Sequence, residues 1–332
     1  MARNKAESPN GPAAIQAVIE QLVEDVDPRI RLIRGYRKKL HPGVEVALKH
    51  ARDIVARIPG PFALDTENWR KEPLVNVAFA RADELPAAVS RSVEVRDFFE
   101  RGAGKLSSEC FALFGMRREE RRIFGKELIG DLIHSDVVQT TVSFTDHRLI
   151  APATTMDELR LAIERRAFHH LVEEAIDQVA RALERKKGLE EQRAVLRLKL
   201  KLMARQRQGL QGLLEAEPHT DQKAEDLQKE LAEVEARFRK LQTTLTNLEN
   251  YVPHLNKVLG HPEQYLSLQD VRLRLNRMNI LVTGRTEEPV HELSLTEATL
   301  RDGRRFVLLL VKCARDQLRS QKMLFEEAAR RL

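Results

Sequence analysis

The stretch LEEQRAVLRLKLKLMARQRQGLQGLL, residues 189–214, decides the fold. Its apolar and long-stemmed residues recur at alternating steps of four and three, which is the 3.5-residue period of a coiled coil. The repeat begins earlier, at Phe168, and keeps its phase through Leu196 to Leu214. A helix in an ordinary core rarely keeps this phase for so many steps. The pattern therefore predicts a long helix that packs along a second one.

A second apolar stripe with the same period runs from Leu227 to Leu259. Glu217-Pro218-His219-Thr220 separates the two stripes, and a connection this short folds two helices back on each other. The sequence therefore predicts an antiparallel helical hairpin with its tip near residues 217–221.

The two stripes also predict the register of the hairpin. If facing residues are matched along both stripes, Met203 faces Phe238 and Leu196 faces Leu245. A register one heptad shorter would require a turn too tight around Pro218, so we expect the first register.

Strand-like segments lie on both sides of the hairpin. Between Asp136 and Phe144, β-branched residues alternate with polar ones, and Thr145-Asp146-His147-Arg148 is the predicted turn after this strand. Asp302-Gly303 is a dipeptide favoured in two-residue hairpin turns. Three strand-like segments follow the hairpin: 279–283, 290–300 and 304–312. We expect strands from both sides to build one sheet, with the hairpin as an insertion.

The globular core is expected in residues 62–144, because nine of the sixteen aromatic residues lie there. The apolar run Phe306–Val311 needs cover on both faces of a sheet. Pro73–Ala80 is expected to be a strand, and Pro86–Glu100 and Ser267–Met278 to be helices.

Helices are expected at both ends of the chain. The first begins at Pro12, the second runs from Asp27-Pro28 to about Leu40, and His41-Pro42 separates it from a third. A terminal helix is expected from Ala314 onward.

The predicted fold class is α+β, mostly α, with a helical N-terminal region and a small mixed or antiparallel sheet base that a long antiparallel coiled-coil hairpin interrupts. The chain divides into five segments: a disordered tail at 1–11, an N-terminal helical segment at 12–61, the first part of the base at 62–154, the hairpin at 155–262 and the second part of the base at 263–332.

Composition indicates a cytoplasmic protein without membrane insertion. The 332 residues carry a formal charge of +6, a milder excess than that of a dedicated nucleic-acid binder. Cys110 and Cys313 lie far apart in the sequence and have no zinc-binding spacing, which favours reduced thiols. The first residues lack an apolar signal segment, and no apolar run approaches the roughly 20 residues that span a bilayer.

The first arm of the hairpin is basic and the returning arm is mildly acidic. Ten bases and three acids lie between Arg181 and Arg207, so the positive charge of the chain concentrates there. Two interpretations stay open: the basic arm pairs with the acidic arm, or it contacts the phosphates of a nucleic acid. The candidate nucleic-acid contacts are Arg197, Lys199, Lys201 and Arg205.

The first arm also has a second apolar stripe. Val195, Leu198 and Leu202 lie outside the stripe that faces the other arm. A helix that is apolar on two sides usually has two neighbours, so these residues are the candidate contact with a partner protein or a second copy.

Catalytic and metal-binding signatures are weak. His169, His170, Glu173 and Glu174 share a helix, but no further ligand cluster accompanies them, so no metal site is expected. Asp146-His147 has no nucleophile in a recognisable motif. No catalytic residue and no cofactor are predicted.

The glycine-rich and arginine-rich clusters do not predict a site either. Gly102-Ala103-Gly104-Lys105-Leu106 lacks the hydroxyl residue of a phosphate loop. Arg117-Arg118 and Arg121-Arg122 are interpreted as solvated helix faces.

The sequence therefore favours a non-enzymatic cytoplasmic scaffold or interaction protein that uses its projecting hairpin for contact with a protein partner or for self-association. The alternative is a nucleic-acid-binding protein that uses the basic face of the first arm. A third possibility is an enzyme whose site is assembled in the base from distant residues, around Asp146, His147 or Glu127.

Overall fold

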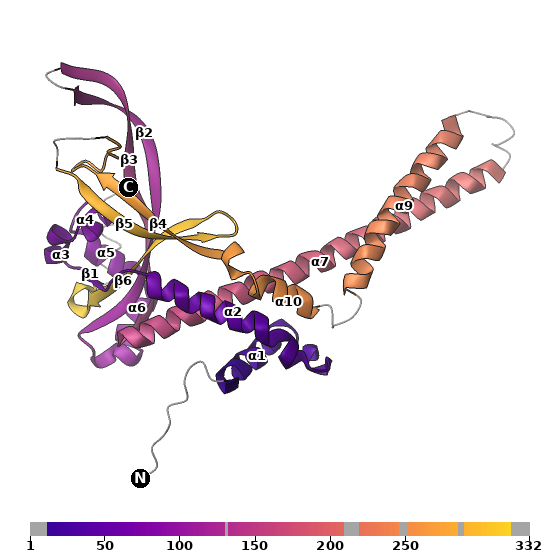
Figure 1. The fold of residues 1–332 in the computed structure, drawn as a ribbon, viewed down its shortest axis with the longest axis horizontal. Coiled ribbons are helices and arrows are strands. Elements are labelled where there is room, and N and C mark those ends of the chain that lie inside the picture. Colours follow the sequence, from indigo (N-terminus) through magenta and orange to yellow (C-terminus); the bar gives the residue numbers. More distant parts are fainter. Residues whose placement is uncertain (1–11, 130–131, 209–218, 246–250, 285–288, 320–332) are drawn as a thin grey trace, which may run out of the picture. The chain divides into compact units, whose positions relative to one another are not determined.

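The computed structural model describes residues 12–129, 132–208, 219–245, 251–284 and 289–319. These residues form two compact units. A helical unit comprises residues up to Ala47 and His170–His261, and a sheet unit comprises Leu48–His169 and the residues from Pro262. Figure 1 shows the elements of both units. The architecture is α+β and mostly α, as expected.

The helical unit contains helices from two parts of the chain. Helices α2 and α7 begin in one unit and continue into the other. The helices are α1 (Pro12–Val26), η1 (Pro28–Leu32), α2 (Tyr36–Arg57), α7 (Met156–Gln208), α9 (His219–Leu245) and α10 (Tyr251–Leu259). Helix α10 contacts the first turns of α2, where Asn256 Nδ2 donates a 2.7 Å hydrogen bond to the carbonyl oxygen of Lys39.

The predicted break at His41-Pro42 is wrong, because α2 runs through Pro42 without interruption. Proline in a helix removes one backbone hydrogen bond and costs about 3 kcal/mol. Burial of a continuous stripe on both sides of the proline offsets this cost, since Leu40, Val44 and Ala47 are all fully buried. Residues 28–32, predicted as the start of an α-helix, form the short 3-10 helix η1 instead.

Helix α7 begins at Met156, in agreement with the predicted start of the hairpin at residue 155. The amide of Glu158 donates to Thr155 Oγ1 at 3.2 Å, and the amide of Thr155 donates to Glu158 Oε2 at 3.2 Å. This reciprocal pair is a capping box, which satisfies backbone donors in the first turn.

Helices α7 and α9 are antiparallel, but their predicted register is wrong. The guanidinium carbon of Arg193 lies 4.3 Å from the centre of the Phe238 ring, and Arg197 Nη2 lies 2.5 Å from Glu235 Oε1. Phe238 therefore lies near Arg193, ten residues before its expected partner Met203.

A slip of one heptad accounts for this difference. It places Phe238 opposite Leu196, and both side chains are buried. This shorter register was not expected, because it requires a tight turn around Pro218. Helix α9 begins at His219, within the predicted tip at residues 217–221. Residues 209–218 lie outside the described residues.

The sheet unit holds one sheet built from both sides of the helical insertion, as predicted. The strand order is β3-β2-β6-β5-β4, every pair along it is antiparallel, and β1 adds to β6 in parallel. The strands are β1 (Phe62–Ala63), β2 (Glu109–Ile129), β3 (Leu132–Ala153), β4 (Leu266–Leu275), β5 (His291–Leu300) and β6 (Arg305–Ala314). Gly303, at φ +84°, forms the predicted turn between β5 and β6.

A short segment joins the two outer strands of this sheet. The amide of Leu281 donates to the carbonyl of Thr140 on β3, and the amide of Val282 donates to the carbonyl of Arg274 on β4, both at 2.8 Å. Residues 279–283, predicted as a strand, are therefore not one: Ile280 and Leu281 form isolated bridges to Thr141 and Leu275, which link β3 to β4.

Short helices cover one face of the sheet. They are α3 (Thr66–Lys71), α4 (Pro73–Ala78), α5 (Glu84–Arg91), α6 (Val93–Glu100) and the 3-10 turn η2 (Ala103–Leu106). The predicted strand at Pro73–Ala80 is wrong: Pro73 occupies the first turn of α4, where a proline is favourable. The predicted helix at Pro86–Glu100 is divided at Ser92, whose Oγ accepts from the Val95 amide and caps α6.

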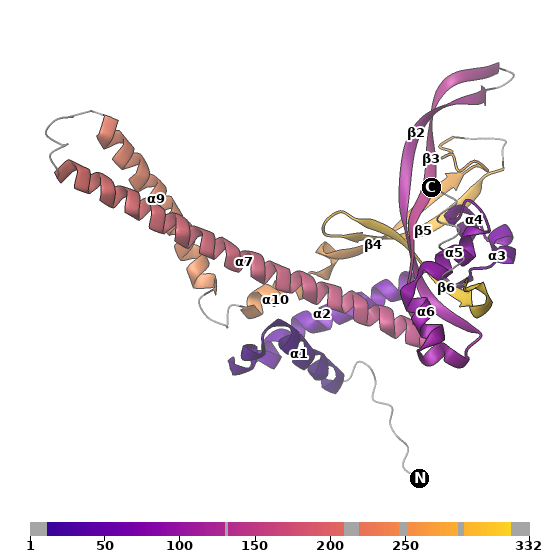
Figure 2. The same ribbon diagram turned by 180° about the vertical axis from the view of Figure 1, so that it is seen from behind.

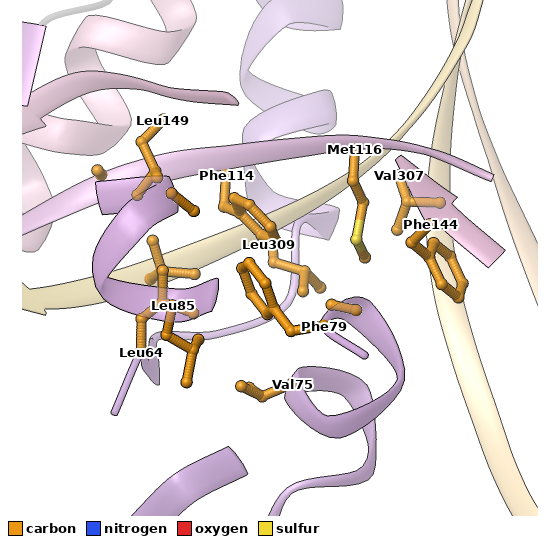
Figure 3. Packing of buried hydrophobic residues seen from close by; sticks show 14 of the residues in the cluster. Leu64, Val75, Phe79, Leu85, Phe114, Met116, Phe144, Leu149, Val307 and Leu309 are labelled. Atoms are coloured by element: carbon orange, nitrogen blue, oxygen red, sulfur yellow. The ribbon is translucent and has the colours of Figure 1, made fainter. Parts of the chain in front are cut away.

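The main core lies between these helices and the sheet, in the part of the chain where the aromatic residues are concentrated. Figure 3 shows Phe79 from the helical layer beside Phe114 of β2 and Leu309 of β6. A second core lies on the opposite face of β6, where Leu310 packs with α7 residues such as Leu159. The run Phe306–Val311 is therefore covered on both faces, as expected.

Strand β3 is longer than predicted and contains three bulges. Asp136, Asp146 and Ala151 have positive φ, and the β2–β3 register shifts beside each of them. The predicted turn at Thr145–Arg148 is therefore wrong: it is a bulge, which leaves an extra residue unpaired while the strand continues.

Two further predictions are wrong. Ser267–Met278 was expected to be a helix, but Leu266–Leu275 is the strand β4. The spacing of its apolar residues is compatible with a helix or a strand. Hydrogen-bonded pairing along the whole of β5 stabilises the strand. Ala314 ends β6, and Arg315–Gln317 form a 3-10 turn, so the expected helix does not begin at Ala314. Residues 320–332 and the tail at 1–11 lie outside the described residues.

Candidate interaction surfaces

The first candidate surface is the exposed stripe of α7, formed by Val195, Leu198 and Leu202. These side chains are 51%, 57% and 51% exposed. Their spacing of three and four residues places them on one side of the helix. This side does not include Leu196, which is buried. The structure thus gives the stripe the exposure that an interaction surface requires.

Helix α9 explains why the other side of α7 is covered. Val234 and Phe238 of α9 are buried, and Phe238 lies beside Arg193 of α7. The apolar body of Phe238 and the stem of Arg193 shield each other, while the guanidinium lies over the aromatic ring. The stripe is the apolar residue set that α9 leaves uncovered.

The candidate nucleic-acid residues divide into two groups. Arg197 forms an ion pair with Glu235 of α9, which is the pairing of basic and acidic arms that one interpretation predicts. Lys199 and Lys201 are exposed on α7. The side chain of Arg205 lies outside the described residues. Among the candidate residues whose side chains are described, Arg197 is therefore neutralised by an acid of α9.

The second candidate surface is the β-ribbon, defined as residues 117–129 of β2 and 132–145 of β3. Pairing of β2 with β6 ends at Met116, and beyond it β2 pairs with β3. Figures 1 and 2 show the two strands extending past the rest of the sheet. Phe124 and Val138 are cross-strand partners and are 77% and 60% exposed, and the neighbouring Ile123 is 41% exposed.

Sequence reasoning missed the β-ribbon. It interpreted Arg117-Arg118 and Arg121-Arg122 as helix faces, whereas all four lie on β2. A strand with solvent on both faces does not need to alternate apolar and polar residues, so these paired charges gave no sign of a strand. The available signal was Val138 to Phe144, whose alternation requires a partner strand nearby.

The base of the β-ribbon is fixed by a buried ion pair. Arg118 Nη2 lies 3.3 Å from Glu297 Oε2 of β5, and both side chains are buried or nearly so. Arg118 also pairs with Glu120 on its own strand. A charge in such a position is stable only while its partner remains.

The Asp146-His147 pair is not assembled for catalysis. His147 Nε2 lies 2.7 Å from the carbonyl oxygen of Ala78, and its ring stacks on Phe79 at 4.6 Å between centres. Asp146 pairs instead with Arg148. Burial lowers the pKa of His147 from its ordinary value, and the hydrogen bond to Ala78 opposes this only in part. A neutral imidazole that donates from Nε2 is a packing residue of the core.

The other candidate sites gain no support as sites. No group of three or more metal-ligating side chains occurs among the described residues, including the helix that carries His169, His170, Glu173 and Glu174. The side chain of Glu127 lies outside the description. Gly104 of the glycine-rich segment contacts the Phe98 ring so closely that any Cβ would overlap it.

Cys110 and Cys313 face each other across β2 and β6, although some two hundred residues separate them in the sequence. Both are fully buried free thiols. The hydrogen bond with Cys110, together with burial, raises the pKa of Cys313, so this thiol stays protonated.

Within the described residues, each helix is too short or too polar to cross a membrane. Comparison with known proteins gives no relative: no family model, no curated protein and no solved structure matches the chain.

Proposed function

We propose that this chain is a non-enzymatic interaction protein whose helical arm, α7 with α9, contacts an amphipathic helix of a partner protein. The observation that carries the proposal is the exposed stripe Val195, Leu198 and Leu202 on a helix whose other side is already packed. Apolar residues in such a row gain free energy by burial, at roughly 25 cal/mol per Å².

The charges beside the stripe indicate the chemistry of the partner. Lys199 and Lys201 flank it and are exposed. A second copy of the same surface would bring these lysines near one another. An apolar helix with acidic flanks complements them instead, so we infer a partner of this kind.

The ion pair of Arg197 with Glu235 favours this function over nucleic-acid binding. A phosphate-binding arm gains affinity from every free cation, and each cation paired within the arm reduces that gain. Nucleic acid remains the alternative that the experiment below distinguishes.

Photo-cross-linking in cells that make the protein tests the proposal. A benzophenone amino acid replaces Leu198, and Glu190, exposed on another side of the same helix, is the matched control position. We expect one discrete product from position 198, with a protein as the attached molecule, and little product from position 190. Attached nucleic acid, or equal products from both positions, contradicts the proposal.

A pair of variants tests the stripe itself. With the photo-cross-linker at Val195, the change Leu198→Glu with Leu202→Glu should remove the product, whereas Glu190→Gln should retain it. Helicity measured by circular dichroism should match between the variants, since exposed Leu and Glu are both good helix formers. An undiminished product in the double variant contradicts the role of the stripe.

We also propose that the protein works in the cytoplasm. The support is the pair of buried thiols Cys110 and Cys313, which face each other on neighbouring strands yet are free. An oxidising compartment favours a disulfide between cysteines at this distance. Cell fractionation tests the proposal, and recovery of the protein in a secreted fraction contradicts it.

A further inference from the structure

Among the residues that the structure describes, the β-ribbon has one regular edge that pairs with no further strand, and this edge belongs to β2. All three bulges of the β2–β3 pair lie in β3, beside Asp136, Asp146 and Ala151. Bulges are one device by which proteins protect a strand edge from pairing with another chain. Beyond Met116, β2 has no bulge of its own, so it retains an edge that can accept another strand.

The hydrogen bonds of β3 show which residues of β2 point outward. The amide of Val142 donates to Asn279 and the carbonyl of Thr140 accepts from Leu281, so residues 140 and 142 direct their backbone groups away from β2. In an antiparallel pair, two directly opposed residues either both direct their backbone N–H and C=O groups toward the partner strand or both direct them away from it. Their partners Arg122 and Glu120, and Phe124 opposite Val138, therefore direct backbone N–H and C=O groups outward.

We propose that the β2 edges of two copies pair antiparallel across a two-fold axis at Ile123, giving a four-stranded sheet. This interface goes beyond the helical-arm contact and uses other residues. Outward-facing residues must pair with outward-facing residues, which restricts the register to steps of two. An axis at Ile123 satisfies this restriction.

The side chains favour this register. With the axis at Ile123, Arg122 of each copy faces Phe124 of the other, so a cation lies beside an exposed aromatic ring on both sides of the axis. The exposed Ile123 then faces its own copy. An axis at Arg121 would instead place two like charges directly opposite each other.

The proposed pairing also accounts for the exposed apolar residues of the β-ribbon. Phe124 and Ile123 lie on opposite faces of the same strand, so no single cover can bury both. A strand added at the edge borders both faces at once. Two copies related by a two-fold axis make the same contact twice from one surface, which is the common way in which identical chains associate.

Sedimentation equilibrium of the full chain tests the proposal. We expect a mass twice 38.1 kDa for the wild type. Arg122→Pro removes an outward N–H from the β2 edge without removing a hydrogen bond within the β-ribbon, so it should give a monomer. The matched control Val138→Pro removes an outward N–H from the β3 edge and should leave the dimer intact.

Engineered cysteines test the register. Ile123→Cys should cross-link two copies under copper–phenanthroline oxidation, because residues opposed without hydrogen bonds have Cα atoms about 4.5 Å apart. Arg121→Cys should cross-link poorly, because it faces Gly125 of the other copy. Cys110 and Cys313 are fully buried and do not interfere.

Three results overturn the proposal: a wild-type monomer at every concentration, a dimer that survives Arg122→Pro, or stronger cross-linking through Arg121→Cys than through Ile123→Cys. The change Leu198→Glu with Leu202→Glu should leave the dimer unchanged. Failure of the helical-arm contact and failure of the β-ribbon contact are therefore distinguishable.

Discussion

Two antiparallel pairs, the helices α7 and α9 and the strands β2 and β3, differ in what fixes their register. Side chains alone join the helices, and their apolar stripes repeat every seven residues, so several registers bury similar residues. Backbone hydrogen bonds join the strands, and a slip of one residue moves every side chain to the other face. Strand register is therefore the more strongly determined of the two.

The bulges of β3 strengthen this difference. Asp136, Asp146 and Ala151 adopt the left-handed conformation that each register shift requires, so the backbone itself carries the alignment. In the helical pair, by contrast, the alignment depends on a few contacts such as Phe238 with Arg193. The four predictions below test this contrast, from the largest expected effect to the smallest.

The largest effect is expected at the base of the β-ribbon. Glu297→Ala removes the buried partner of Arg118 and leaves only the exposed Glu120 beside it, which should lower the free energy of unfolding of the sheet unit by about 3 kcal/mol. Trp69, the one tryptophan of the chain, donates from its ring to the carbonyl of Phe79 and reports on this unit in urea unfolding followed by fluorescence.

The matched control replaces both charges. Arg118→Met with Glu297→Leu should be far less destabilising than Glu297→Ala alone, because no buried charge remains. Equal destabilisation in the two variants would show that the ion pair does not fix the base of the β-ribbon.

The second effect concerns the helical pair. Phe238→Ala removes a buried ring from the contact between α7 and α9, at an expected cost of about 3 kcal/mol. The loss should appear in helicity measured by circular dichroism at 222 nm, while the Trp69 transition stays unchanged. A shifted Trp69 transition would contradict the separate stability of the two pairs.

A pH dependence is expected where the strands enter the sheet. Burial lowers the pKa of His147 below its ordinary value of 6.5, so the unfolded chain binds this proton more readily than the folded one. The resulting stability is fully present above pH 6.5 and is lost as pH falls below it. Urea unfolding followed by Trp69 between pH 8 and 5 measures this loss.

The control for this effect is His147→Phe, which retains an aromatic ring but cannot titrate. Its stability should change less over the same pH range. His254 of α10 also has a lowered pKa, from burial first and then from nearby Lys257 and Arg185, so His254→Gln should leave the Trp69 curve unaltered. An identical slope for His147→Phe and the wild type would rule out His147 as the source.

The smallest effect is the most direct test of helix register. A double-mutant cycle between Arg193→Ala and Phe238→Leu should give a coupling energy of about 0.5–1 kcal/mol from the cation over the ring. A cycle between Met203→Ala and Phe238→Leu should give none. Coupling through Met203 instead would restore the register first predicted from the sequence.

The sequence predicts features that depend on neighbouring residues. The Thr155–Glu158 capping box, the Asp302-Gly303 turn and the apolar run of β6 each follow from a few adjacent side chains, and all are present. The sequence predicted a helix break at Pro42 and a helix at the position of strand β4. Both predictions are wrong, because packing against distant parts of the chain outweighed the local preference.

The candidate surfaces show the same limit. Val195, Leu198 and Leu202 could be found from the sequence, because the helical period places them on a different side of the helix from the packed stripe. The exposure of Phe124 could not be predicted, because aromatic residues are usually buried and this general tendency does not identify the exceptions. Its exposure depends on where β6 stops pairing with β2, which is set by residues nearly two hundred positions away.

The position of β6 has a consequence for the order of folding. It lies between β2 and β5, so β2 cannot join β5 and β4 until the ribosome has made residues 305–314. The chain in between must close a loop of nearly two hundred residues, an entropic cost that contacts repay only after β6 docks. The helical arm consists of local contacts and can form first. Synthesis therefore leaves the β2 edge that pairs with β6 without its partner strand until late, and this interval is when the nascent chain is most open to aggregation.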